Sequence, residues 1–175
     1  MQSLAQCTLE KTRNADEAGW LPPVANGSGS ISEVTFTKDE MAIWTWLVSK
    51  GVANALSGLS QMVGHEIRVT SLDLEQLSVK DAAGLMGGPD ALGVGIYLAI
   101  DGDATGHLML MHEPKVAFQL VDMQLGLPPG STQKLEEIER SVLGEMGNIT
   151  GSFFLNALAD ATNLSLMPSP PAVMA

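Results

Sequence analysis

The sequence predicts an α+β fold in which two long helices pack on a largely antiparallel sheet. Apolar residues recur at helical spacing from residue 39 to 63 and again from about residue 132 to 162. Between these stretches, two apolar runs at 93–100 and 106–112 flank Asp101-Gly102-Asp103, which is a strong β-hairpin signal. With 175 residues, 45% of them hydrophobic, the chain is long enough to bury one sizeable core.

The folded domain is expected to span residues 34–175. Residues 1–33 mix charged residues with prolines and a Gly/Ser-rich stretch and lack a hydrophobic period, so we interpret them as a flexible lead-in. The first long helix follows, and Gly64 suits its left-handed end. Residues 67–71 alternate apolar and polar side chains, which predicts a short strand, and residues 78–90 are interpreted as a loop with room for a helical turn.

After the hairpin, residues 114–125 form a short amphipathic pattern with proline in the first turn and glycine directly after it, which predicts a helix. Ser131 or Thr132 is expected to cap the second long helix, which runs to about Thr162 with Asn163 as its left-handed end. Residues 164–173 are expected to be extended because their prolines exclude a helix.

A weak internal repeat relates the two helices. A shift of 99 residues superposes Leu59, Gly64 and Ile67 on Leu158, Asn163 and Leu166. The domain is therefore expected to have pseudo-twofold halves, residues 39–128 and 129–175. A strand and a hairpin follow the first helix, whereas one extended segment follows the second, so the second half is expected to be incomplete. An unpaired sheet edge would favour a homodimer.

One face of the second helix carries a polar line. At about 100° per residue, Ser141, Glu145, Asn148 and Ser152 fall within roughly 60° of one another. Apolar residues on a neighbouring arc are expected to face the core; these are Val142, Met146, Ile149 and Phe153. For an arbitrary helix, such a polar line is simply its solvent-exposed face. Glycines at 144, 147 and 151 indicate close backbone approach, either to the first helix or to a partner.

The spacing S-x3-E-x2-N-x22-P, from Ser141 to Pro171, resembles the signature of the CheC/CheX/FliY phosphatases of bacterial chemotaxis. The similarity extends over most of residues 40–175, including "GLPPGST" before the second helix and "YLAIDGDATGHLMLM" in the hairpin. It is strongest to CheC-like proteins with one intact site, because the shifted positions in the first half hold other residues: Ala42, Trp46, Ser49 and Leu72.

The resemblance implies hydrolysis of the phosphoaspartate on a CheY-like response regulator. Asn148 would orient the water and Glu145 would anchor the regulator through its lysine, with Ser141 and Pro171 in support. The chain would need no cofactor of its own, since the receiver domain supplies Mg²⁺. The alternative is a noncatalytic binding module of the same family, which serves as a partner of the CheD deamidase or as a flagellar switch component. A small-molecule enzyme is disfavoured, because no nucleophile, base and metal constellation is evident.

Composition excludes several other functions. A net charge of −11 with nine basic residues argues against nucleic-acid binding. No apolar run approaches the ~20 residues that span a bilayer, and the single cysteine, Cys7, suits a reducing compartment, so a cytoplasmic location is expected. The three histidines have no metal-ligand spacing, which predicts that the protein has no metal site.

Overall fold

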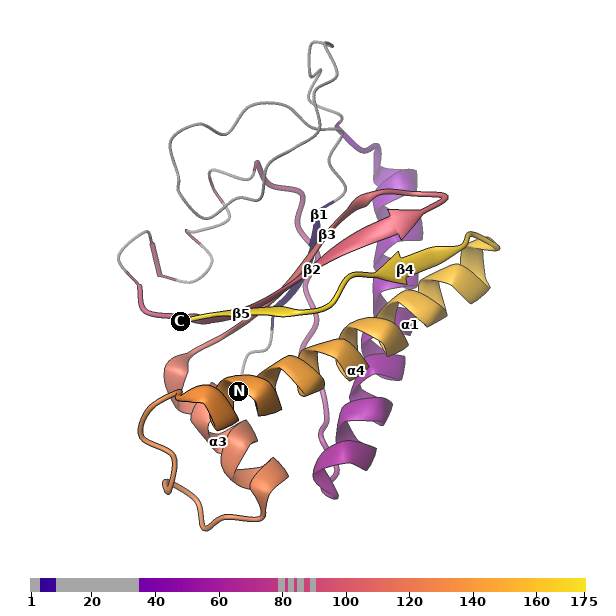
Figure 1. Cartoon of the computed structure of the whole chain (residues 1–175). Coiled ribbons are helices and arrows are strands. Elements are labelled where there is room, and N and C mark those ends of the chain that lie inside the picture. Colours follow the sequence, from indigo (N-terminus) through magenta and orange to yellow (C-terminus); the bar gives the residue numbers. More distant parts are fainter. Residues whose placement is uncertain (1–3, 9–34, 79–80, 82–83, 85–86, 89–90) are drawn as a thin grey trace.

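A computed structural model describes residues 4–8 as backbone and residues 35–78, 81, 84, 87–88 and 91–175 in full. Its α+β architecture confirms the predicted fold class: helix α4 lies against an antiparallel sheet, and α1 packs across α4 (Figure 1). The elements in chain order are β1 (Leu4–Thr8), α1 (Lys38–Val63), β2 (Val94–Gly102), β3 (Gly106–His112), α3 (Pro114–Leu125), α4 (Glu137–Thr162), β4 (Leu166–Pro168) and β5 (Ala172–Met174).

The sheet is built around the predicted hairpin. Strands β2 and β3 pair in an antiparallel register from Val94 opposite His112 to Ile100 opposite Gly106. β1 adds to the free edge of β3, and both β4 and β5 pair with β2 at the other edge. Residues 4–8 are therefore a strand, where we expected a lead-in without regular structure. Pairing with a distant strand supplies hydrogen bonds that the local sequence pattern does not reveal. The remainder of the expected lead-in, up to residue 33, lies outside the described residues.

The two long helices confirm the repeat. α1 and α4 each have 26 residues, and both their first and last residues differ by 99 in number. Gly64 and Asn163 end them in the left-handed conformation, with φ of 68° and 59°. At the start of each helix, a glutamate side chain accepts a hydrogen bond from the backbone N–H of the residue that precedes the helix. Glu40 accepts from Thr37 at the start of α1, and Glu139 accepts from Glu136 at the start of α4. Helix α4 begins several residues later than expected, because Ser131 and Thr132 belong to the preceding loop.

Two further predictions concern the segments after the helices. Residues 67–71 are not a strand; they run without a β ladder, and the backbone N–H of Ile67 donates to Ser60 Oγ at 2.9 Å. Much of the expected 78–90 loop lies outside the described residues. Residues 164–173 avoid helix as predicted, and the prolines between Pro168 and Pro171 divide them between β4 and β5.

Glycines set the distances between the layers. A Cβ at Gly51 of α1 would lie 2.5 Å from the Phe154 ring on α4, so a larger residue would separate the helices. A Cβ at Gly147 of α4 would lie 2.3 Å from Ile96 Cγ2 on β2. Gly147 therefore serves packing on the sheet, which is a third role besides the two that we considered, contact with the first helix and access for a partner.

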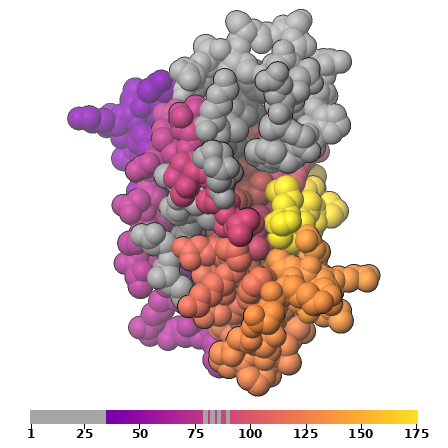
Figure 2. Space-filling view, turned by 90° about the vertical axis from the view of Figure 1, so that its left-hand side faces the viewer, coloured from indigo at the N-terminus to yellow at the C-terminus, as the bar shows by residue number. Residues whose placement is uncertain are grey.

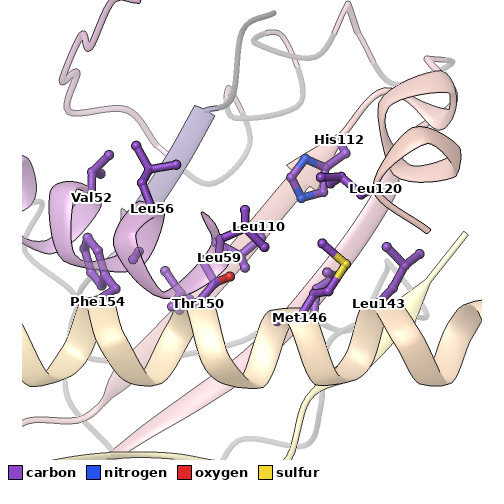
Figure 3. A pocket seen from close by; sticks show the side chains of 14 residues that line it. Val52, Leu56, Leu59, Leu110, His112, Leu120, Leu143, Met146, Thr150 and Phe154 are labelled. Carbon is purple, nitrogen blue, oxygen red and sulfur yellow. The ribbon is translucent and has the colours of Figure 1, made fainter. Parts of the chain in front are cut away.

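A small interior cavity of about 70 Å³ remains where α1, α3, α4 and the sheet meet (Figure 3). Its walls are almost entirely aliphatic and aromatic, with His112 and Thr150 as the polar side chains among the residues that line it. Burial lowers the pKa of His112 below its ordinary value, because the charged imidazolium loses hydration there. The cavity therefore favours a neutral histidine at the end of β3.

Candidate functional site

The four residues of the predicted signature line one shallow groove. Ser141, Glu145 and Asn148 come from successive turns of α4, and Pro171 comes from the segment that enters β5. The groove is completed by Glu137, Arg140, Gly144 and Val173. Residues that are up to 30 positions apart in the chain thus share one surface.

The polar face of α4 is open, whereas its opposite face is fixed in the core. Ser141 and Glu145 are exposed and Asn148 is half-buried, while Leu143 and Met146 are buried between them. Of the arc expected to face the core, only Met146 is fully buried; Val142, Ile149 and Phe153 are partly buried. The buried line of the helix is displaced because Gly147 and Gly151, rather than large side chains, face the sheet.

The side chains of Ser141, Glu145 and Asn148 make no hydrogen bond or ion pair with any described residue. We expected Ser141 to support the polar line through a hydrogen bond, and no such bond is present in the described part of the chain. The carboxylate and the amide are therefore free to engage groups of another molecule. The two groups lie one turn apart on a rigid helix. The Glu145 carboxylate can accept a hydrogen bond from a cationic side chain, and the Asn148 amide can orient a water.

The second wall of the groove is attached to α4 by Arg140, which the sequence reasoning missed. Its Nη1 donates to the backbone oxygen of Val173 at 3.5 Å, and its Nε donates to the oxygen of Leu135 at 3.2 Å. A Cβ at Gly144 would lie 3.8 Å from Val173 and 3.9 Å from Pro171, so the segment passes close to the helix backbone. No local pattern links Arg140 to residue 173; only the fold brings them together.

A buried carboxylate organises the loop that leads into α4. Asp122 on α3 is 2% exposed and accepts the backbone N–H groups of Gly130, Ser131 and Thr132 at 2.7, 3.1 and 2.8 Å. The Thr132 hydroxyl and these N–H groups stabilise the charged form and lower the pKa of Asp122, although burial opposes them. The "GLPPGST" segment is thus held in place before the helix that carries the site. No local sequence pattern indicates this role of Asp122.

The equivalent face of α1 carries different chemistry. Ala42, Trp46 and Ser49 occupy the positions that match Ser141, Glu145 and Asn148, and all three are exposed. Leu72, at the position of Pro171, is partly buried. This face has neither a carboxylate nor an amide at the matching positions. The described part of the chain also contains no cluster of three or more metal-ligating side chains and no helix that could cross a membrane.

Comparison with known proteins places the site in a family context. A model of the CheC-like family matches residues 138–175, which include all four signature residues. The CheY-P phosphatase CheC of Bacillus subtilis is 30% identical over 138 residues, which cover 78% of this chain and 66% of that protein. This chain therefore spans about two thirds of the length of that relative.

Two solved structures share the fold at low sequence identity. Thermotoga maritima FliY has a TM-score of 0.66 and 20% identity, with 81% of this chain and 70% of that chain covered. The FliM middle domain from H. pylori has a TM-score of 0.60 and 13% identity, with 80% of this chain and 75% of that chain covered. At these identities the two likenesses establish a common architecture.

Proposed function

The chain belongs to the CheC-like family, and from this premise we propose that it hydrolyses the phosphoaspartate of a CheY-like response regulator. One observation carries the proposal. Glu145 and Asn148 project from one open face of α4 into a groove whose other wall begins at Pro171, and neither side chain is engaged by described residues. An exposed helix edge of this kind can enter the active site of a second protein.

The chemistry requires positioning more than covalent participation. Water attacks the phosphorus in line with the bond to the aspartate oxygen; that bond breaks, and the products are inorganic phosphate and the free carboxylate. Because the transition state is loose, an amide that holds the water in line suffices, and Asn148 can do this. The phosphorylated receiver domain, with its bound Mg²⁺, is the substrate. Glu145 would pair with a lysine of the regulator and fix the helix in place.

The surroundings of the site support this role. The packing of Gly147 on Ile96 sets the distance of α4 from the sheet at a point of the helix axis between Glu145 and Asn148. Arg140 attaches the second wall to the helix. A catalytic side chain must be held to within about 0.5 Å of its productive position, and rigid elements achieve this better than loops.

The decay of a phosphorylated receiver domain, with and without this protein, tests the proposal. Asn148→Ala should slow the accelerated decay by about 10²–10³-fold, the usual cost of losing one positioned polar group. It should leave the melting temperature unchanged or slightly raised, since alanine is the better helix former. Ser49→Ala is the matched control: it changes the equivalent position of α1 and should retain full activity.

Glu145→Ala separates anchoring from water orientation. If Glu145 anchors the regulator, its loss should raise KM more than it lowers kcat, whereas Asn148→Ala should act on kcat. Full activity of folded Asn148→Ala protein would rule out the assigned chemistry. Absence of acceleration by the wild-type chain would rule out the phosphatase.

A second candidate function is a noncatalytic binding module, either a partner of CheD or a component of the flagellar switch. Its support is the likeness of this fold to the FliM middle domain. The two functions separate cleanly in one experiment. A module that binds the receiver domain tightly but leaves the phosphoaspartate lifetime unchanged would favour the second candidate.

A further inference from the structure

Helix α1 exposes a stripe that contributes nothing to the core or to the groove. At about 100° per residue, Asp39, Ile43, Trp46 and Lys50 lie within roughly 60° of one another, and these four residues are called the α1 stripe below. Ile43 is 59% exposed and Trp46 is 52% exposed. The helix forms one flank of the molecule in Figure 2, in indigo to magenta.

The apolar centre of the α1 stripe is unusual for a solvent-exposed helix face. A half-exposed tryptophan beside an exposed isoleucine costs hydration free energy, and tryptophan is the residue type most enriched among interface hot spots. The two flanking charges are also unused: Asp39 and Lys50 are exposed and form no ion pair with described residues. An apolar centre with free charges at both ends has the composition of an interface.

The order of these residues makes the α1 stripe complementary to itself. The point of the helix between Trp44 and Thr45 is the midpoint of two residue pairs. The inner pair is Ile43 and Trp46, and the outer pair is Asp39 and Lys50. When two copies of α1 pack antiparallel about a twofold axis at that point, each Trp46 lies on the Ile43 of the other copy. Each Lys50 then lies beside the other copy's Asp39. Like residues never oppose one another in this arrangement.

We propose that the α1 stripe is a homodimer interface in which two copies of the chain pack antiparallel through α1. The charge pattern favours a second copy over an unrelated partner. A strongly basic partner surface would be repelled by Lys50, and a strongly acidic one by Asp39, whereas the reversed stripe presents the opposite charge at both ends. Because a chain with a net charge of −11 repels its own copies, such local pairing is needed for association.

The proposed dimer leaves the α4 groove accessible. None of the residues that line the groove belongs to α1. Each dimer would therefore present two independent grooves, and the inference stands or falls separately from the proposed phosphatase activity.

Sedimentation equilibrium of the full chain tests the interface. The wild-type chain should be a dimer at micromolar concentration. Trp46→Ala should raise the dimer dissociation constant by on the order of a hundredfold, the range of a hot-spot residue. Lys50→Glu alone, or Asp39→Lys alone, should raise it by on the order of tenfold, because each creates two like-charge contacts per dimer.

Charge exchange makes the test specific to the antiparallel register. An equimolar mixture of the Lys50→Glu chain and the Asp39→Lys chain should form a heterodimer, since both contacts are then between opposite charges. The doubly substituted chain should dimerise like the wild type. Melting curves establish that each variant is folded. The proposed contact should give a dimer dissociation constant of about 1 μM. A wild-type chain that stays monomeric up to about 100 μM would therefore overturn the proposal. A dimer that is indifferent to Trp46→Ala and to charge exchange would also overturn it.

Discussion

Substituting Gly147 should displace the helix that carries the site. In Gly147→Ala, the new methyl group would lie 2.3 Å from Ile96 Cγ2, more than 1 Å inside ordinary van der Waals contact. Ile96 is 2% exposed on the central strand β2 and lines the small interior cavity, so either its side chain turns toward that cavity or helix α4 moves outward. An outward shift of α4 by about 1 Å can cost about 10²-fold in a reaction that depends on positioning.

The free energy of unfolding follows from two opposing contributions. Overpacking of this severity costs about 3 kcal/mol, at the upper end of the usual range. Replacing a glycine inside a helix by alanine returns about 1 kcal/mol. The net loss should be about 2 kcal/mol, which corresponds to a decrease in melting temperature of roughly 4–8 °C for a chain of this size.

Gly144→Ala is the matched control, one turn earlier on the same helix. A Cβ there meets nothing nearer than 3.8 Å, so only the gain in helix propensity applies, and stability should rise by up to about 1 kcal/mol. Thermal or urea unfolding of both variants measures the difference.

A double-mutant cycle with Ile96→Ala identifies the contact responsible. The combined Gly147→Ala and Ile96→Ala chain should be more stable than the sum of the single losses predicts, by at least about 1 kcal/mol. If Gly147→Ala stabilises the protein as Gly144→Ala does, the inferred clash between a side chain at position 147 and Ile96 is refuted.

Two further predictions concern the half-buried His112 and the buried Asp122. The pKa of His112 is lower in the folded chain than in the unfolded chain, so on acidification the unfolded chain binds this proton first. The contribution of neutral His112 to stability is therefore complete above the ordinary histidine pKa, and it is lost as the pH falls below about 6.5. The melting temperature should therefore decrease between about pH 7.5 and pH 5.5, and His112→Gln should flatten that dependence while His65→Gln, at an exposed position, should not. An unchanged slope in His112→Gln would contradict this. Asp122→Asn should lower the melting temperature and increase proteolysis between Gly126 and Thr132, because the amide nitrogen cannot accept the loop N–H groups. Asp73→Asn, at an exposed aspartate, is its control, and equal stability of the two variants would refute the anchoring role of Asp122.

The sequence by itself determined the local elements and their repetition. The hairpin, the α3 helix, the left-handed ends at Gly64 and Asn163 and the 99-residue relation all follow from periodicity and from single residues whose conformational preferences act locally. The four signature residues could also be found, since three lie on one helical face and the spacing to Pro171 is part of the family pattern.

Tertiary structure decided everything that depends on contacts between distant segments. Residues 4–8 become a strand only because β3 offers a free edge, and α4 begins at Glu137 because Asp122 holds Thr132 in the loop. Arg140 reaches Val173, and Gly147 faces Ile96, through contacts between residues 33 and 51 positions apart. A local pattern records which side of a helix is apolar, but it does not record which strand or loop the chain brings against that side.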